Sequence, residues 1–305
     1  MSEKNGRIHD RPHFFKFATH EAALKIIESK SLKWSSPVAY NDPFDHQAGF
    51  VLDLEEKSFA HLLTDSMLRI IFTDTPVNVG ASKLFTQLLL LSRYARDRLP
   101  REEMSIQLYE AALHVAKNIT EGIDDFNTAI HSELLHSRVL CVSEEINNVV
   151  MWSHYADKHR GVAFQLGCIE NLDNRLLAAQ PVVYTDRFLA FPSALEYAQH
   201  LTGERPINMV ALIWKIAYTK HLDWAYEKEW RVRIPLLNEN PSTDFTFYDE
   251  PTKVFQALYL GCRMELSQIE SVIQVAAKVL PHIKIYRSVQ SRTSYSLSFE
   301  LIKGA

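Results

Sequence analysis

The chain has 305 residues, which is enough for a sizeable buried core and lies near the upper limit for a single one. Its apolar share of 47% and charged share of 23% are ordinary for a folded globular protein and exclude a largely disordered chain. The net charge of −4 excludes a global basic field, so non-specific binding to a phosphate backbone is not expected, although a local basic groove stays open.

The three cysteines, Cys141, Cys168 and Cys262, are scattered and form no CxxC pair. They indicate neither a disulfide framework nor a cysteine-rich zinc site, and they favour a reducing compartment. Residues 1–7 lack the apolar core of a signal peptide. The longest apolar run, residues 209–214, is far short of the ~20 residues that cross a bilayer. We therefore expect a soluble, cytoplasmic protein with no membrane partner.

The chain begins with a pattern of strand, helix and strand. Residues 13–17 predict a short strand because aromatic side chains suit a pleated surface. Thr19 is a plausible N-cap for a helix that carries Ile26 and Ile27 at helical spacing. Residues 32–35 alternate apolar and polar side chains, as a half-buried strand does.

The stretch from about residue 55 to residue 135 differs from its surroundings, because apolar residues recur there at helical spacing and no strong strand candidate interrupts them. We expect a single elaborated domain, 1–305, with a helical insertion at 55–135. Later segments mix the two patterns: strands at 138–143, 161–166, 182–184, 229–234, 254–260, 284–286 and 295–301, and helices at 188–200, 208–219 and 267–278. Such irregular mixing predicts an α+β fold with a mixed or mainly antiparallel sheet.

Residues 40–45, with the sequence YNDPFD, form the first motif that could carry chemistry. Pro43 disfavours the helical region for Asp42, so the segment predicts a turn. Asp42 and Asp45 could hold a cation or orient a polar substrate. For Asp42 we favour the simpler interpretation, a turn carboxylate bonded to its own backbone, and we expect Phe44 to anchor the turn in the core.

The second motif, residues 147–157, predicts a short helix. Asn147 is a fair N-cap, and Gly161 suits a left-handed position beyond the helix end. The spacing of Val149, Trp152 and Ala156 places them on one face, which we expect to be buried.

An adjacent, more polar face of this helix carries Met151, His154 and Tyr155. His154 could act as an acid or base or bind a ligand, although a packed, hydrogen-bonded histidine is the commoner situation. His154, Asp157 and His159 have a spacing that matches no metal-ligand pattern, so no metal site is expected.

The third motif, residues 224–235, is the most informative. With a period of two, Trp230, Val232 and Ile234 share the core face of a strand. If strand geometry already holds at residue 227, the opposite face carries four charged side chains, Glu227, Glu229, Arg231 and Arg233. These form either a solvated ladder of opposite charges, each pair worth ~1 kcal/mol or less, or a carboxylate pair at a pocket rim with arginines that hold a phosphate or carboxylate. Taken alone, the pattern favours the solvated ladder.

Several motifs in this order resemble the bacterial domain-of-unknown-function 2971 (DUF2971) family. They are LKWSSP at 32–37, NDPFD at 41–45, CVS at 141–143, MWSHYA at 151–156, GV at 161–162, Trp224 with EKEWR at 227–231, and LGCRM at 260–264. The resemblance runs from about residue 13 to residue 287. It implies little about activity, because the family is defined by its unknown function.

The layout is also similar to that of ADP-ribosyltransferases, α+β enzymes with an early strand–helix–strand unit and a Glu-x-Glu pair on a late strand. Glu227-Lys228-Glu229 has that form. The similarity implies an enzyme that consumes NAD, in which Glu229 stabilises an oxocarbenium-like sugar as nicotinamide leaves and Glu227 acts on the acceptor side. A role in a bacterial toxin or in anti-phage defence would suit this activity.

The same similarity implies where NAD would bind. Lys16 or His13 would take the place of the usual first-strand arginine or histidine, and Ser143 is the nearest substitute for the usual Ser-Thr-Ser strand. An aromatic side chain would stack on nicotinamide. The implied NAD-binding residues are Lys16, Tyr40, Ser143, His154, Tyr155 and Arg231.

Two other functions stay open. A non-enzymatic regulatory or interaction protein would have Glu227 and Glu229 fully paired with arginines and no pocket. A nucleic-acid enzyme or binder would use a local basic groove and would take Asp42 and Asp45 as metal ligands; the groove would consist of Lys228, Arg231, Arg233 and Arg263. A small nucleotide is a possible partner, and a protein or nucleic-acid acceptor is left open.

Overall fold

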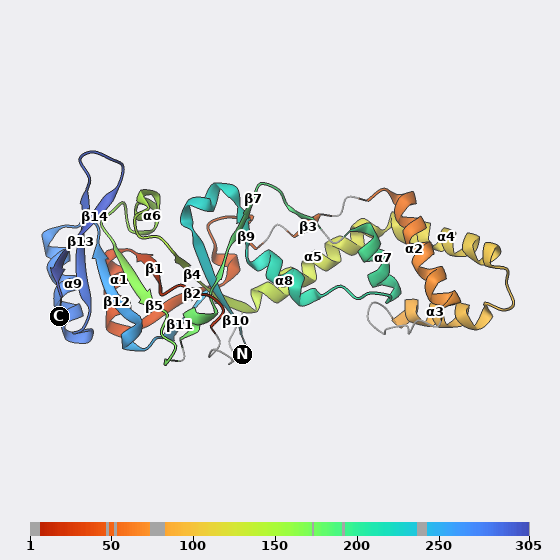
Figure 1. Ribbon diagram of the computed structural model, residues 1–305, viewed down its shortest axis with the longest axis horizontal. Coiled ribbons are helices and arrows are strands. Elements are labelled where there is room, and N and C mark those ends of the chain that lie inside the picture. The colour runs from red at the N-terminus through yellow and green to blue at the C-terminus, as the bar shows by residue number, and fades with distance from the viewer. Residues whose placement is uncertain are drawn as a thin grey trace. The chain divides into compact units, whose positions relative to one another are not determined.

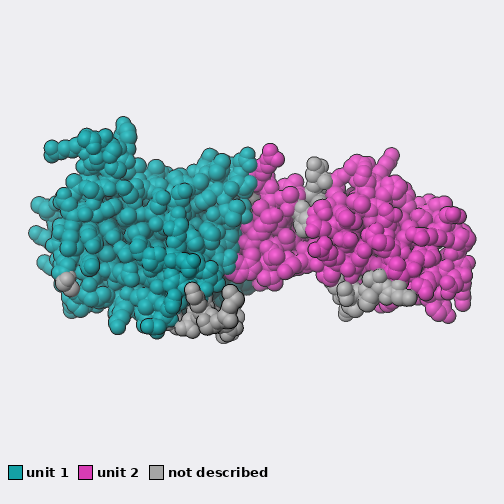
Figure 2. All heavy atoms as spheres, viewed as in Figure 1, with its two compact units in different colours: residues 1–46, 134–186, 218–305 teal, residues 47–133, 187–217 magenta. Residues whose placement is uncertain are grey.

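The computed structural model describes residues 7–46, 49–51, 54–73, 83–172, 174–190, 193–236 and 243–304. The chain divides into two compact units (Figure 2). The first comprises Met1–His46, Leu134–Asp186 and Tyr218–Ala305, and the second comprises Gln47–Glu133 and Arg187–Ala217. This division does not test whether the chain is a single domain with a helical insertion at 55–135, which stays a prediction.

The first unit is built on one large sheet, with strand order β11-β2-β4-β1-β5-β12-β13-β14, and with β10 beside β4 and β6 beside β10 (Figure 1). Among its pairings, β12 and β13 are parallel and the others are antiparallel. This confirms the predicted α+β fold with a mixed, mainly antiparallel sheet. The strands are β1 (His13–Ala18), β2 (Ser31–Ser35), β4 (Ser137–Ser143), β5 (Val162–Gly167), β6 (Gln180–Pro181), β10 (Glu229–Pro235), β11 (Phe245–Asp249), β12 (Phe255–Leu260), β13 (Lys284–Gln290) and β14 (Leu297–Lys303).

One face of this sheet is apolar and is covered by α1 (His20–Ser29) and α9 (Leu266–Val279). Ile27 of α1 and Val272 of α9 are fully buried against the sheet. The predicted N-cap of α1 is confirmed, since Thr19 accepts a hydrogen bond from the backbone N–H of Ala22. Alternation along the strands sends every second residue to this core and the residues between to the opposite face.

The opposite face of the sheet carries α6 (Val149–Tyr155), which lies on the other side from α1 and α9 (Figure 1). Trp152 and Ala156 are fully buried, as predicted, and they pack with Phe15 and Phe17 of β1. The residue that caps α6 is Asn148 and not the predicted neighbour, because its side chain accepts from the first free N–H groups of the helix.

The chain leaves α6 through a turn that differs from the prediction for Gly161. Gly161 does not have a positive φ; three non-glycine residues before it, Asp157, Lys158 and His159, do. The glycine is required for a different reason, because an added Cβ would lie 2.1 Å from the carbonyl oxygen of Ala18. Gly161 therefore permits the close approach of two backbone segments.

A fork in the sheet creates the space for a pocket. Both β1 and β2 pair with β4, but at different points: Phe15 lies opposite Ser143, and Ser35 lies opposite Val139. Cys141 falls between these two pairings, and its carbonyl accepts a hydrogen bond of 2.8 Å from the Nζ of Lys16. A lysine side chain thus satisfies a backbone group where the two strands diverge.

Short elements complete the first unit. Strand β7 (Val183–Thr185) pairs in parallel with β9 (Thr219–His221), which leads into the 3₁₀ helix η3 (Leu222–Glu227). The other 3₁₀ helices are η1 (Pro37–Ala39), η2 (Arg175–Ala178) and η4 (Thr252–Val254). The turn at residues 42–45 follows η1. Asp42 accepts a hydrogen bond from the N–H of Phe44, as expected, but Phe44 itself is exposed and does not anchor the core, since the turn directs Asp45 inward instead.

The second unit is mainly helical. Its central helix α2 packs against α4 and α7 through a continuous buried stripe that includes Phe59, Leu63 and Ile70. The helices are α2 (Glu56–Phe72), α3 (Lys83–Ala95), α4 (Arg101–Lys117), α5 (Ile119–Leu135), α7 (Ala194–Thr202) and α8 (Met209–Ala217), and β3 (Phe50–Val51) pairs with β8 (Leu189–Ala190). In the part of the chain that the structure describes, no helix has both the length and the apolar character needed to traverse a bilayer.

Candidate functional site

A pocket of about 440 Å³ opens in the first unit at the fork between β1, β2 and β4. It contains most of the side chains that the sequence implicated. The residues from that set that line it are Lys16, Tyr40, Asp45, Ser143, Tyr155, Glu227 and Glu229. Two further lining residues, Lys33 and Lys220, were not singled out from the sequence.

Arg231 is a fully buried clamp that holds two carboxylates. Its guanidinium donates two hydrogen bonds to Asp45, of 2.9 and 2.5 Å, and two to Glu229, of 2.7 and 3.0 Å. The solvated ladder considered from the sequence is therefore wrong for Glu229 and Arg231, which are 5% and 1% exposed. They face inward because, opposite Ser143 and Cys141 of β4, they lie on the pocket side of the sheet.

Glu227 reaches the same pocket by a different route from the one predicted. Strand geometry does not hold at residue 227, which is the last residue of η3. Lys228 follows with a φ of 46°, in the left-handed region, and β10 begins only at Glu229. Ser143 fixes the end of η3 by donating a hydrogen bond of 2.7 Å to the carbonyl of Glu227. Ser143 thus acts here by positioning the acidic pair.

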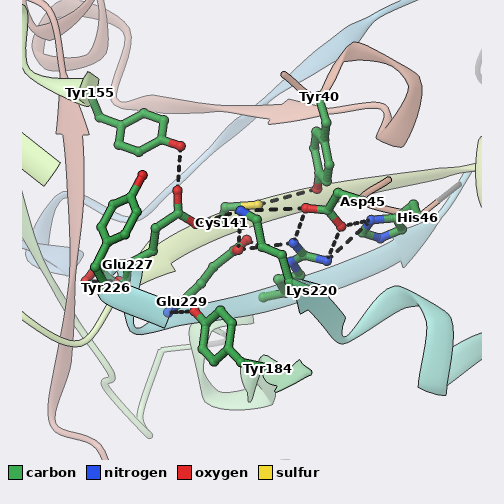
Figure 3. Close-up of polar contacts among 12 residues, drawn as sticks. Tyr40, Asp45, His46, Cys141, Tyr155, Tyr184, Lys220, Tyr226, Glu227 and Glu229 are labelled. Carbon is green, nitrogen blue, oxygen red and sulfur yellow. Dashed lines mark hydrogen bonds and ion pairs between the residues drawn. The ribbon is translucent and has the colours of Figure 1, made fainter. Parts of the chain in front are cut away.

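Lys220, from β9, joins the acidic side chains into one cluster. Its Nζ lies 2.6 Å from Glu227 and 3.1 Å from Glu229, and 3.6 Å from Asp45. Figure 3 shows Tyr155 beside Glu227 at one end of this cluster and Tyr40, Asp45 and His46 at the other. Burial lowers the pKa of Lys220, but the charges of Glu229, Glu227 and Asp45 outweigh this effect and raise it, so the ammonium stays charged.

The pKa values of the two glutamates are driven apart. Burial raises the pKa of Glu227, and the nearby charge of Glu229 adds to this effect while Lys220 opposes it. Burial acts in the same direction on Glu229, but the charges of Arg231 and Lys220 outweigh it and lower its pKa to about 2. Two carboxyl groups with opposite shifts in one pocket are suited to different roles, one as a fixed anion and the other in proton transfer.

Tyrosine side chains border the cluster. Tyr155 donates a hydrogen bond of 2.5 Å to Glu227, and burial together with that carboxylate raises the pKa of its hydroxyl, which therefore stays a donor. The ring of Tyr40 lies 5.6 Å from the guanidinium carbon of Arg231, and its hydroxyl lies 3.4 Å from the sulfur of Cys141. Burial raises the pKa of the Cys141 thiol to about 12, so this cysteine is not a thiolate.

Two predicted binding residues do not line the pocket: Arg231 lies buried behind Asp45 and Glu229 and holds their carboxylates, and His154 lies outside it. The side chain of His154 is exposed, and its Nδ1 lies 3.1 Å from the hydroxyl of Tyr226. Met151, which the helical pattern placed on the same polar face, is buried and lines the pocket. Adjacent residues of an α-helix point in different directions, so Tyr155 lines the pocket while the neighbouring His154 is exposed.

Two lysines form a cationic end of the pocket. Within the described residues, neither Lys16 nor Lys33 forms an ion pair with a carboxylate. Burial lowers the pKa of Lys16, and the more distant charges of Glu229 and Glu227 oppose this effect without outweighing it. The ammonium of Lys33 lies 4.4 Å from the ring centre of Phe245. Lysines that line a pocket without an acidic partner are suited to bind phosphate or carboxylate groups.

The arrangement bears on the two alternatives to an NAD-consuming enzyme. Both carboxylate oxygens of Asp45 accept from Arg231, which occupies the atoms that the nucleic-acid alternative assigned to a metal. Within the described ranges, no group of three or more histidine, cysteine, aspartate or glutamate residues is arranged to hold a metal ion. The regulatory alternative required fully arginine-paired glutamates and no pocket, whereas Glu227 bonds Lys220 and Tyr155 and faces a pocket.

Fold and site together define an α+β protein with a buried cluster of acidic and basic side chains at a pocket. The family model described as "Protein of unknown function (DUF2971)" matches residues 151–232. The resemblance to DUF2971 is therefore confirmed over a segment that contains Tyr155, Lys220, Glu227, Glu229 and Arg231. No curated protein and no solved structure matches the chain.

Proposed function

We propose that this protein is an enzyme that binds NAD in the pocket of the first unit and breaks the bond between nicotinamide and ribose. The observation that carries the proposal is that one pocket contains two glutamates whose pKa values are shifted in opposite directions and two lysines that pair with no carboxylate of the described residues. The volume of about 440 Å³ falls within the range of roughly 300–1,000 Å³ that is usual for small-molecule sites.

The charges of the cluster support a role in stabilising a positively charged transition state. Asp45, Glu227 and Glu229 carry three negative charges when ionised, and Lys220 and Arg231 carry two positive charges. Among these five side chains the surplus is one negative charge, and the two further cations of the pocket, Lys16 and Lys33, lie at its other end. A fixed anion in a sheltered pocket favours positive charge that develops on a ribose.

The proposed reaction uses the two glutamates differently. As the glycosidic C–N bond breaks, its electron pair moves to the nicotinamide nitrogen and cancels the charge of the pyridinium ring. Glu229, which stays ionised, stabilises the ribose cation that remains. Glu227, whose pKa is raised, accepts the proton of the attacking water or acceptor hydroxyl as the new C–O bond forms.

The cationic end of the pocket would hold the diphosphate of the dinucleotide. Lys16 projects from β1 and Lys33 from β2, on the two arms of the fork. Among the residues that the structure describes, their ammonium groups form no ion pair with a carboxylate that an incoming anion would have to displace. Tyr40 or Tyr155 offers an aromatic ring to nicotinamide at the acidic end.

The test is nicotinamide release from NAD by the purified protein, separated by liquid chromatography, with water alone and with candidate protein or nucleic-acid acceptors. We expect Glu229→Gln to slow release by roughly 10²–10³-fold, because an electrostatic stabiliser is lost, and Glu227→Gln to slow it by roughly 10²–10⁴-fold, because a general base is lost. The same assay in cells, as a fall in NAD, tests a role in a toxin or anti-phage system.

A matched control is Glu250→Gln, which changes another buried glutamate whose pKa is raised by burial but which does not line the pocket. It should leave the rate of release unchanged. Folding of each variant is checked by circular dichroism. If well-folded wild-type protein releases no nicotinamide, or if Glu250→Gln and Glu229→Gln have the same effect, the proposed reaction is wrong.

A further inference from the structure

Two exposed phenylalanines stand on β11, at the edge of the large sheet. Phe245 is 43% exposed and Phe247 is 56% exposed, and their rings lie 5.5 Å apart in an edge-to-face arrangement. The remaining aromatic residue of the strand, Tyr248, packs against the core on the other side. Exposed aromatic rings at neighbouring positions of one sheet face are characteristic of surfaces that bind a partner or ligand.

The register of the sheet connects these rings to the pocket. Phe247 lies opposite Lys33, and Phe245 lies opposite Ser35, in the antiparallel pairing of β11 with β2. Directly opposed residues project from the same face of a sheet, and both Lys33 and Ser35 line the pocket. The two phenylalanines therefore continue the pocket face outward by one strand, a step of about 5 Å.

Lys33 bridges the pocket and the aromatic pair. It belongs to the pocket lining, and its ammonium lies 4.4 Å from the ring centre of Phe245. An anionic group bound at this ammonium is thus held beside the phenylalanines. A group attached to that anion on the outer side of the pocket is within reach of Phe245 and Phe247.

We propose that Phe245 and Phe247 form a base-stacking subsite for the adenine end of a nucleotide whose phosphate is bound by Lys33. This inference rests on the proposed function and names the part of the ligand that lies outside the pocket. A purine has a flat apolar face that stacks on an aromatic side chain, and a phosphate lies within one ribose of it. The order along the sheet, from acidic pair to lysines to aromatic rings, matches the order ribose, diphosphate, adenosine in the proposed substrate.

The test measures equilibrium binding of two probes by isothermal titration calorimetry. AMP carries both phosphate and base, and ribose 5-phosphate carries the phosphate without the base. We expect Phe247→Ala to weaken AMP by roughly 5- to 150-fold, the range for loss of one base–aromatic stack, and to leave ribose 5-phosphate unchanged. Lys33→Met should weaken both probes together.

Tyr295→Ala is the matched control, because Tyr295 is a fully exposed aromatic residue in the turn between β13 and β14. It should leave both affinities unchanged. The subsite is wrong if the wild-type protein binds AMP no more tightly than ribose 5-phosphate, or if Phe247→Ala leaves AMP affinity unchanged. It is also wrong if Phe247→Ala converts a dimer to a monomer, because β11 would then pair with a second copy.

The outcomes separate this inference from the proposed function. Nicotinamide release that is normal in wild type, combined with AMP binding that does not depend on Phe247, refutes the subsite alone. AMP binding that depends on Phe247, without any nicotinamide release, supports the subsite and refutes NAD cleavage.

Discussion

Replacement of Arg231 by methionine should destabilise the first unit strongly. The guanidinium is 1% exposed and donates to both Asp45 and Glu229, so its removal leaves two buried carboxylates without their main partner. Removing one member of a buried ion pair typically costs about 3–5 kcal/mol. Lowering the pKa of Glu229 from 4.5 to about 2 corresponds to a stabilisation on the order of 3 kcal/mol at neutral pH, much of which depends on this arginine.

The effect should depend on pH in a defined direction. A carboxyl group whose pKa is depressed by folding contributes stability above its unfolded-state value, here 4.5, and this contribution disappears as the pH falls toward about 2. Asp45 has its pKa lowered by Arg231 against the effect of burial, and it adds to the same trend. The difference in the free energy of unfolding between wild type and Arg231→Met should therefore be largest near neutral pH and should shrink toward about pH 3.

Urea unfolding followed by tryptophan fluorescence measures this difference, since Trp34 and Trp152 are buried in the first unit. Arg11→Met is the control. Arg11 also pairs with a carboxylate, that of Glu144, but its side chain is 47% exposed, so a loss of about 1 kcal/mol or less is expected. A decrease in the free energy of unfolding below about 1 kcal/mol for Arg231→Met would refute the reasoning. So would a decrease that is the same at neutral pH and at about pH 3.

Two further predictions concern single contacts. Tyr155→Phe removes the hydrogen bond that stabilises ionised Glu227, so the pKa of that glutamate should rise further. The acidic limb of the pH–rate profile for nicotinamide release should therefore move to higher pH. An unshifted limb would exclude Glu227 as the titrating group. Gly161→Ala places a Cβ 2.1 Å from the Ala18 carbonyl oxygen and should lower the unfolding free energy by about 1–3 kcal/mol in thermal melts. Gly122→Ala, in helix α5 with its nearest contact at 3.5 Å, should not destabilise, and equal effects of the two substitutions would contradict the steric argument.

The parts of the fold that followed from the sequence are those with a strong local pattern. Aromatic and alternating residues predicted β1 and β2, and the helix of residues 267–278 appears as α9. Strand β11 was not predicted, although residues 245–249 include three aromatic side chains, which suit a strand. Its aromatic residues point both to solvent and to the core, so the segment lacks the alternation of apolar and polar residues from which a half-buried strand is predicted.

The candidate site was predictable only in its acidic pair and several surrounding residues. Lys220 was missed because nothing in the spacing of residues 218–221 distinguishes it from a surface lysine, and its role arises from the turn through η3 that brings it back to Glu227. The contact of Asp45 with Arg231 joins residues 186 positions apart in the sequence, which no local pattern encodes. Burial of that ion pair is a tertiary property, and it is what converts a surface-like charge pattern into a pocket cluster.

In the proposed complex, one pocket binds a nucleotide with its phosphates at the lysines and its ribose at the glutamates. The most direct measurement is a crystal structure of the protein with ADP-ribose. We expect phosphate oxygens within hydrogen-bond distance of the Nζ atoms of Lys16 and Lys33 and the terminal ribose beside Glu227 and Glu229. Electron density for the ligand at any other surface of the protein, with this pocket unchanged, would contradict this proposal.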